Sequence, residues 1–110
     1  MQTIEGMQTA ALQIISYSGE ARSHFVEAIR EGRAGHYQKA DSLIKAGEEA
    51  YNKIHQVHFS LIQKEANGEI LPFSLLFIHA EDQMLTTETL KIMAVEMIEL
   101  CKMVVEGKTG

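Results

Sequence analysis

Hydrophobic residues recur at steps of three and four along three long segments of the chain, as on one face of an α-helix. In the first segment such a row runs Ile4, Met7, Ala11, Ile14, Ser18, Ala21, Phe25 and Ala28. Beside it lies a second row of Leu12, Ile15, Gly19, Arg22, Val26 and Ile29. In the third segment the row is Leu76, His79, Gln83, Thr86, Leu90, Met93, Met97, Leu100 and Val104. The pattern predicts an all-α protein.

Two breaks separate these segments: the glycines within 32–35, and Asn67-Gly68 followed by Pro72. Glycine suits the left-handed residue that closes a helix, proline is tolerated in a first turn, and Ser74 is a candidate N-cap. The sequence therefore predicts one domain over residues 1–110, an antiparallel up-down-up bundle of three helices. The helices are expected at roughly 4–32, 36–67 and 73–106.

Composition narrows the class of protein. The 110 residues carry a net charge of −5, which argues against a nucleic-acid partner. A single cysteine, Cys101, excludes an internal disulfide and fits a reducing cytoplasm. No apolar run reaches the roughly 20 residues that cross a bilayer, and no signal pattern opens the chain, so a cytoplasmic location is expected. The two adjacent apolar rows of the first segment exceed what one bundle buries and predict a homo-oligomer.

Polar residues interrupt the apolar face of the third helix. On a helical projection, Asp82, Gln83 and Thr86 fall within about 60° of His79, whereas Glu81 falls about 160° away. A buried Asp82 would be costly without a cation, a proton or several donors. Asp82 therefore either reaches water or pairs with a lysine at the bundle edge, or lies on an oligomer axis around a shared Mg²⁺ or Ca²⁺.

Three interpretations of His79 remain open from the residues alone. It is a structural histidine, a metal ligand that converges with His55 and His58, or a nucleophile that accepts a phosphoryl group. In the third case Gln83 and Thr86, with His55 and His58 on the second helix, would supply hydrogen bonds. Counting outward from a loop centred near residue 70 places His58 at the height of His79 or Gln83.

The segment 75–86, LLFIHAEDQMLT, resembles the active-site helix of the lactose/cellobiose-type enzyme IIA components of the phosphoenolpyruvate-dependent sugar phosphotransferase system, which typically reads VHAQDHLMT. The likeness covers nearly the whole chain. Further matching motifs, in order, are 14–23 (IISYSGEARS), 39–43 (KADSL), His55 and 62–69 (IQKEANGE).

The resemblance implies a trimer of three-helix bundles in which His79 accepts a phosphoryl group from the histidine-containing phosphocarrier protein. His79 then passes it to a cysteine of the IIB component, which works with the membrane IIC component in sugar uptake. It also implies that Asp82 binds a metal ion, expected to be Mg²⁺, on the trimer axis. The alternative function is non-catalytic: a metal-centred helical trimer that acts as a regulatory or interaction protein.

This sequence departs from the family pattern at three positions. Glu81 and Gln83 stand where the family usually has Gln and His, and His58 stands where it usually has Gln. If positions 58 and 83 are neighbours, an imidazole and an amide have traded places in one pocket around His79.

Overall fold

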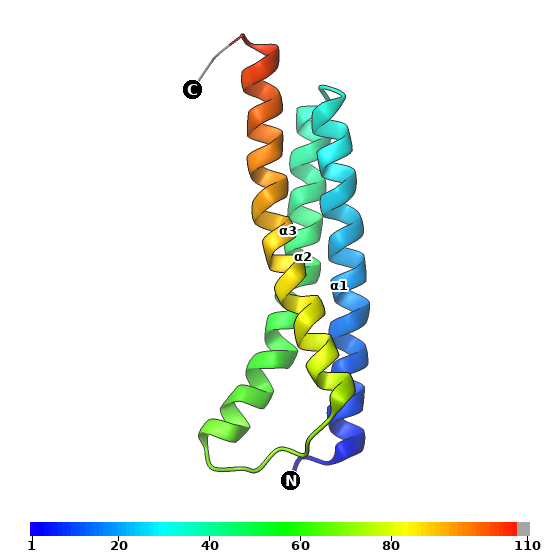
Figure 1. Cartoon of the computed structure of the whole chain (residues 1–110), viewed down its shortest axis with the longest axis vertical. Helices are drawn as coiled ribbons and strands as arrows, with labels where there is room; N and C mark the ends of the chain where they lie inside the picture. Colours follow the sequence, from blue (N-terminus) through cyan, green and yellow to red (C-terminus); the bar gives the residue numbers. More distant parts are fainter. Residues whose placement is uncertain (108–110) are drawn as a thin grey trace.

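The computed structural model describes residues 1–107, which form three helices and no strand. These are α1 (Ile4–Arg33), α2 (Tyr37–Ala66) and α3 (Leu75–Val105). Figure 1 shows them running up, down and up, with the N-terminus beside the α2–α3 connection. The bundle measures 57 × 23 × 19 Å. The predicted all-α bundle is confirmed, and the predicted helix ends differ from the observed ones by at most two residues.

Side-chain caps mark the starts of two helices. The hydroxyl of Ser74 accepts a hydrogen bond from the Phe77 amide at 3.1 Å, and Thr3 caps α1 in the same way through Gly6 at 3.0 Å. Gly68, which follows α2, has a φ of +92°, as expected for a helix-closing glycine. The Ser74 cap matters most because it sets where α3 begins, and therefore where the candidate site residues fall.

The core of the bundle contains the apolar row predicted in the first segment from Met7 to Ala28, whereas its first member, Ile4, is exposed. Met7, Ile14 and Phe25 are buried in α1, and Ile44 and Ile54 are buried opposite them in α2. Small residues such as Ala11, Ala21, Ala28, Ala40 and Ala50 let the helices approach closely.

The row predicted for the third segment is not the core row. The residues of α3 that the bundle buries are Phe77, Ala80, Met84, Thr87, Ala94 and Ile98. The predicted row instead contains exposed residues, among them Met93 and Leu100. The prediction was wrong here because α3 is apolar on more than one side, so periodicity alone did not distinguish the face toward α1 from the face toward solvent.

The helices do not pack equally. α1 packs against both other helices, whereas α2 and α3 meet less extensively and diverge toward the connection between them (Figure 1). None of the helices in the described part of the chain has the length and apolar character needed to cross a lipid bilayer.

Candidate functional site

His79 lies in the second turn of α3, with an exposed side chain. The Ser74 cap starts the helix five residues earlier and so orients the turn that carries the imidazole. Within residues 1–107, His79 has no hydrogen-bond or ion-pair partner. Because a neutral imidazole carries a free lone pair on one ring nitrogen, this unengaged ring is available as a nucleophile.

Gln83 and Thr86 differ in what they offer near His79. Gln83 is partly buried and lies four residues further along α3, where its side chain neighbours His79 on the helix surface. The Thr86 hydroxyl donates within α3 to two backbone carbonyls, that of Asp82 at 3.0 Å and that of Gln83 at 3.1 Å. The Thr86 hydroxyl proton is therefore used within α3, whereas the Gln83 side chain makes no hydrogen bond within residues 1–107.

Asp82 is exposed and follows the apolar outward face of α3. Along this face Leu75, Leu85 and Leu100 are exposed by 71%, 55% and 59%. A single carboxylate does not hold a divalent cation, and residues 1–107 contain no group of three or more histidine, cysteine, aspartate or glutamate side chains arranged for a metal. Within one chain Asp82 therefore reaches water. A cation at Asp82 requires ligands from further copies of the chain.

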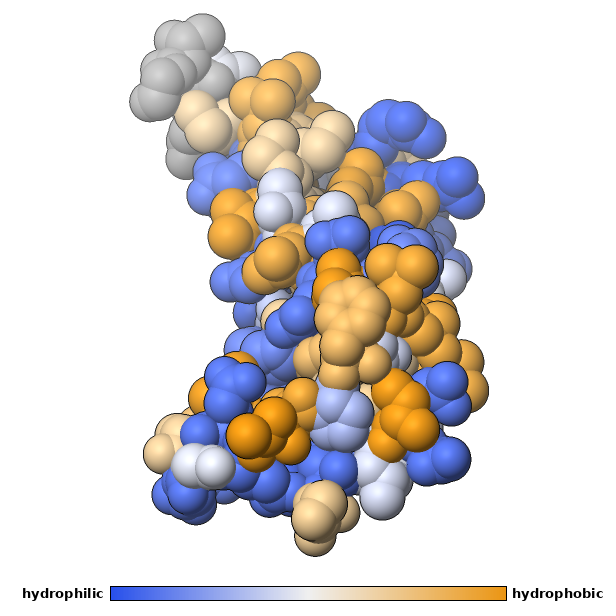
Figure 2. Space-filling view, turned by 60° about the horizontal axis from the view of Figure 1, so that its bottom comes forward, coloured by the Kyte–Doolittle hydropathy of each residue, from blue (hydrophilic) through white to orange (hydrophobic). Residues whose placement is uncertain are grey.

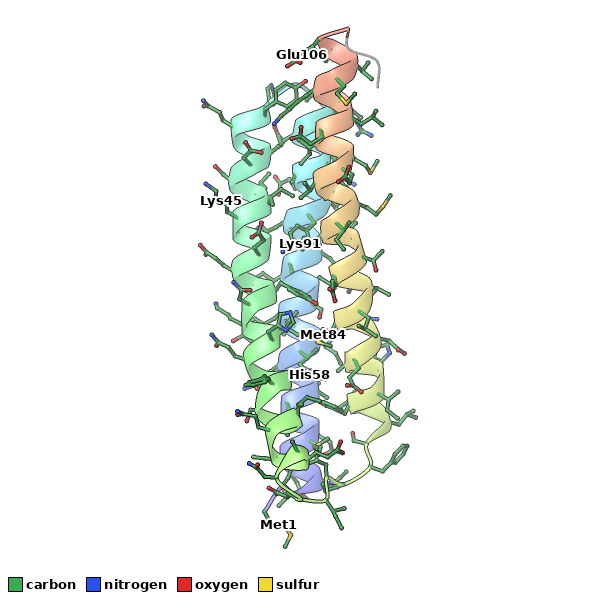
Figure 3. The ribbon with its side chains drawn as sticks, turned by 90° about the vertical axis from the view of Figure 1, so that its left-hand side faces the viewer. Met1, Lys45, His58, Met84, Lys91 and Glu106 are labelled. Carbon is green, nitrogen blue, oxygen red and sulfur yellow. The ribbon has the colours of Figure 1, made fainter. Side chains whose placement is uncertain are left out.

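His58 does not join His79. Its Nε2 lies 2.7 Å from Oε2 of Glu81, across the seam between α2 and α3, and its ring stacks on Phe77. Figure 3 shows His58 between these two helices. Glu81 projects about 160° around α3 from His79. Within one chain His58 therefore pairs with position 81 rather than with position 83, and its predicted support of His79 stays a prediction.

His55 also belongs to the α2–α3 seam. Its ring meets the ring of Tyr51 edge-on at 4.8 Å, and the Tyr51 hydroxyl donates to Glu88 of α3 at 3.1 Å. Burial, together with the nearby Glu88 carboxylate, raises the pKa of Tyr51 to about 12. The alternative metal site made of His55, His58 and His79 is not formed in the described part of the chain.

Sequence reasoning missed the Tyr51–Glu88 bridge. The spacing of these residues indicates the bridge: Tyr51 and His58 are seven residues apart on α2, and Glu81 and Glu88 are seven residues apart on α3. Two turns of helix separate such positions on one face, so the two pairs form successive links along an antiparallel seam.

Apolar side chains are also exposed at the end of the molecule near His79. They gather around the α2–α3 connection, as Figure 2 shows, and include Phe59, Ile62, Ile70, Phe73 and Ile78. An exposed apolar surface of this kind is typical of a site where another protein binds.

Comparisons with known proteins identify the class more closely. Residues 9–102 match the family described as PTS system, Lactose/Cellobiose specific IIA subunit. The chain belongs to this family. The match includes His79 and Asp82.

Relatives in this family match over most of their length. The chain is 40% identical over 92 residues to the oligo-beta-mannoside-specific EIIA component of Bacillus subtilis (strain 168), covering 84% of each protein. It is 35% identical over 98 residues to the lactose-specific EIIA component of Staphylococcus aureus (strain N315), covering 89% of this chain and 95% of the relative. Among solved structures, the cellobiose-specific enzyme IIA from Bacillus anthracis matches with a TM-score of 0.87 and 37% identity, over 99% of this chain and 97% of that one.

Proposed function

We propose that this protein is the phosphocarrier of a lactose/cellobiose-type phosphotransferase system and that His79 carries the phosphoryl group. The observation that supports this most strongly is the exposed imidazole of His79, which has no partner among residues 1–107, in a chain of this family. Family membership favours this function over a non-catalytic, metal-centred trimer.

The proposed reaction is an in-line displacement at phosphorus. A ring nitrogen of His79 attacks the phosphoryl group on the histidine of the histidine-containing phosphocarrier protein. A new N–P bond forms as the donor's N–P bond breaks, and the donor imidazole leaves with the electron pair. In the next step a cysteine thiolate of the IIB component attacks the same phosphorus, and His79 is the leaving group. Positioning and electrostatic stabilisation supply most of the rate in such transfers.

Gln83 is the proposed donor to the phosphoryl oxygens. Its side chain lies one helical turn from His79 and has no hydrogen bond within the described residues. The predicted support of His79 by His55, His58 and Thr86 stays a prediction. Within one chain the His55 ring meets that of Tyr51, His58 pairs with Glu81 and the Thr86 hydroxyl donates within α3.

The proposed assembly is a homotrimer formed through the outward face of α3. This face exposes a run of apolar side chains whose burial would favour association: Leu75, Ile78, Leu85, Ile92, Met93, Met97, Leu100 and Val104. Asp82 projects toward the middle of this face, between Ile78 and Leu85 along the helix. In a trimer three copies of Asp82 would face one another, and a divalent cation, proposed to be Mg²⁺, would offset their repulsion.

The proposed partners follow from the same function. The relatives are named for different sugars, so the step that they share is phosphoryl transfer rather than sugar binding. The protein would act in the cytoplasm and would be recruited to the membrane IIC transporter through IIB. Its net charge of −5 suits docking to basic surfaces, which predicts encounter rates that fall with ionic strength.

Incubation with phosphoenolpyruvate, enzyme I and the histidine-containing phosphocarrier protein tests the proposal, with intact mass as the readout. Wild type should gain one acid-labile phosphoryl group and His79→Ala none. His36→Ala is the matched control, because the His36 side chain is exposed and pairs with Glu31 near the far end of the bundle. Wild type without an adduct, or an adduct that survives in His79→Ala, would overturn the proposal.

A further inference from the structure

A pair of polar side chains, His58 of α2 and Glu81 of α3, links the first turns of α3 to α2. His58 and Glu81 approach to 2.7 Å, with 19% and 37% of their side chains exposed. The His58 ring also lies nearly parallel to the ring of Phe77, at 8° and 6.2 Å between centroids. Glu81 is two residues from His79, so this link lies on the same turn of α3 as the candidate nucleophile.

Apolar packing alone leaves this end of the seam incompletely filled. α2 and α3 diverge here (Figure 1), and a cavity of about 280 Å³ lies between them. Its walls include Met7, Leu61 and Phe77 as well as His58 and Glu81. Where side chains do not interlock, a charge-assisted hydrogen bond has more influence on the position of the helix.

A second polar link between the same helices lies two helical turns further from His79. The Tyr51 hydroxyl donates to Glu88 at 3.1 Å, seven residues from His58 on α2 and seven from Glu81 on α3. This bridge spans the same two helices where α3 is already packed through Met84 and Thr87, both of them buried. It therefore offers a matched comparison for the His58–Glu81 link.

We infer that His58 is a positioning residue for phosphoryl transfer: by holding Glu81 it sets the orientation of the first turns of α3 and hence of the His79 imidazole. This inference rests on the proposed function, in which His79 is the phosphoryl carrier. His58 acts through Glu81 and does not touch the reacting atoms. In-line displacement is sensitive to such placement, because a misplacement of about 1 Å can cost a hundredfold in rate.

The experiment measures the transfer rate from the phosphorylated histidine phosphocarrier protein in single turnovers, at a range of carrier concentrations. His58→Leu, and independently Glu81→Leu, should lower the maximal rate at least about tenfold, with little change in the carrier concentration that gives half of it. His58→Gln should restore most of the rate, because its amide reaches about as far as Nε2 of histidine and donates to Glu81. The double variant should lose no more than either single variant.

Tyr51→Phe is the control, since it removes the other bridge. It should lower the thermal midpoint about as much as His58→Leu and leave the maximal rate unchanged. Equal rates in wild type and both leucine variants, or an equal loss in Tyr51→Phe, would overturn the inference. Failure of the proposed function gives a different result, namely no phosphoryl group on His79 in wild type.

Discussion

Gly47 of α2 lies directly against the ring of Phe25, a fully buried residue of α1. A Cβ atom added at Gly47 would come within 2.8 Å of both Cδ1 and Cζ of that ring. Real Cβ atoms do not approach this closely, so the close contact of α1 with α2 depends on the missing side chain.

Gly47→Ala should therefore destabilise the bundle, although alanine is the better helix former. Overpacking of this kind costs about 1–3 kcal/mol, more than the roughly 0.5–1 kcal/mol gained by removing a helical glycine. Urea unfolding of wild type and variant measures the difference. Gly19→Ala is the matched control: apart from its own stretch of helix, no described atom lies within 4 Å of its added Cβ, so stability should rise. A Gly47→Ala protein as stable as Gly19→Ala would contradict the packing described for Phe25.

Tyr51 should make stability depend on pH in the alkaline range. Burial, aided by the Glu88 carboxylate, raises its pKa from 10.0 to about 12. Because the folded pKa lies above the unfolded one, the stabilisation is complete below pH 10 and is lost as pH rises through about 12. The free energy of unfolding of wild type should therefore fall more steeply over this window than that of Tyr51→Phe, in urea titrations at pH 9, 10, 11 and 12. Parallel curves would show that the phenol is not held as described.

Asp82→Leu should test the proposed trimer axis. Replacing a buried charge by an apolar side chain of similar size is often neutral or stabilising by about 1–4 kcal/mol. The variant should remain trimeric in native mass spectra and lose its dependence on divalent cation, whereas chelation should weaken the wild-type trimer. A monomeric variant, or a wild type indifferent to chelator in both mass and thermal midpoint, would contradict a cation shared at Asp82.

Local signals predicted the helices well. Ser74 and Gly68 are capping residues by their own chemistry, and both occupy the predicted positions. The row from Met7 to Ala28 is buried because α1 packs against both other helices, and this row faces them. Those parts of the fold depend on residues close together in the sequence.

The sequence was a poorer guide to the surroundings of His79. Counting from the loop placed residue 58 at the correct height, close to residues 79 and 83, but height does not determine which face of α3 meets α2. The partner on the facing side is Glu81, as the 2.7 Å contact shows. That rotation is determined by tertiary packing of Phe77, Ala80 and Met84, which the periodic pattern of an apolar helix did not reveal.

The most direct test of the central claim is to locate the phosphoryl group in the sequence. Complete tryptic cleavage separates the histidines, because the peptide from Glu65 to Lys91 contains His79 and no other, whereas His55 and His58 share the peptide from Ile54 to Lys64. Mass spectrometry at alkaline pH, after phosphorylation by the histidine-containing phosphocarrier protein, should place the added phosphoryl group on the peptide with His79. Addition of the IIB component should then remove it. A phosphoryl group found on the peptide with His55 and His58, or one on His79 that IIB leaves in place, would contradict the account.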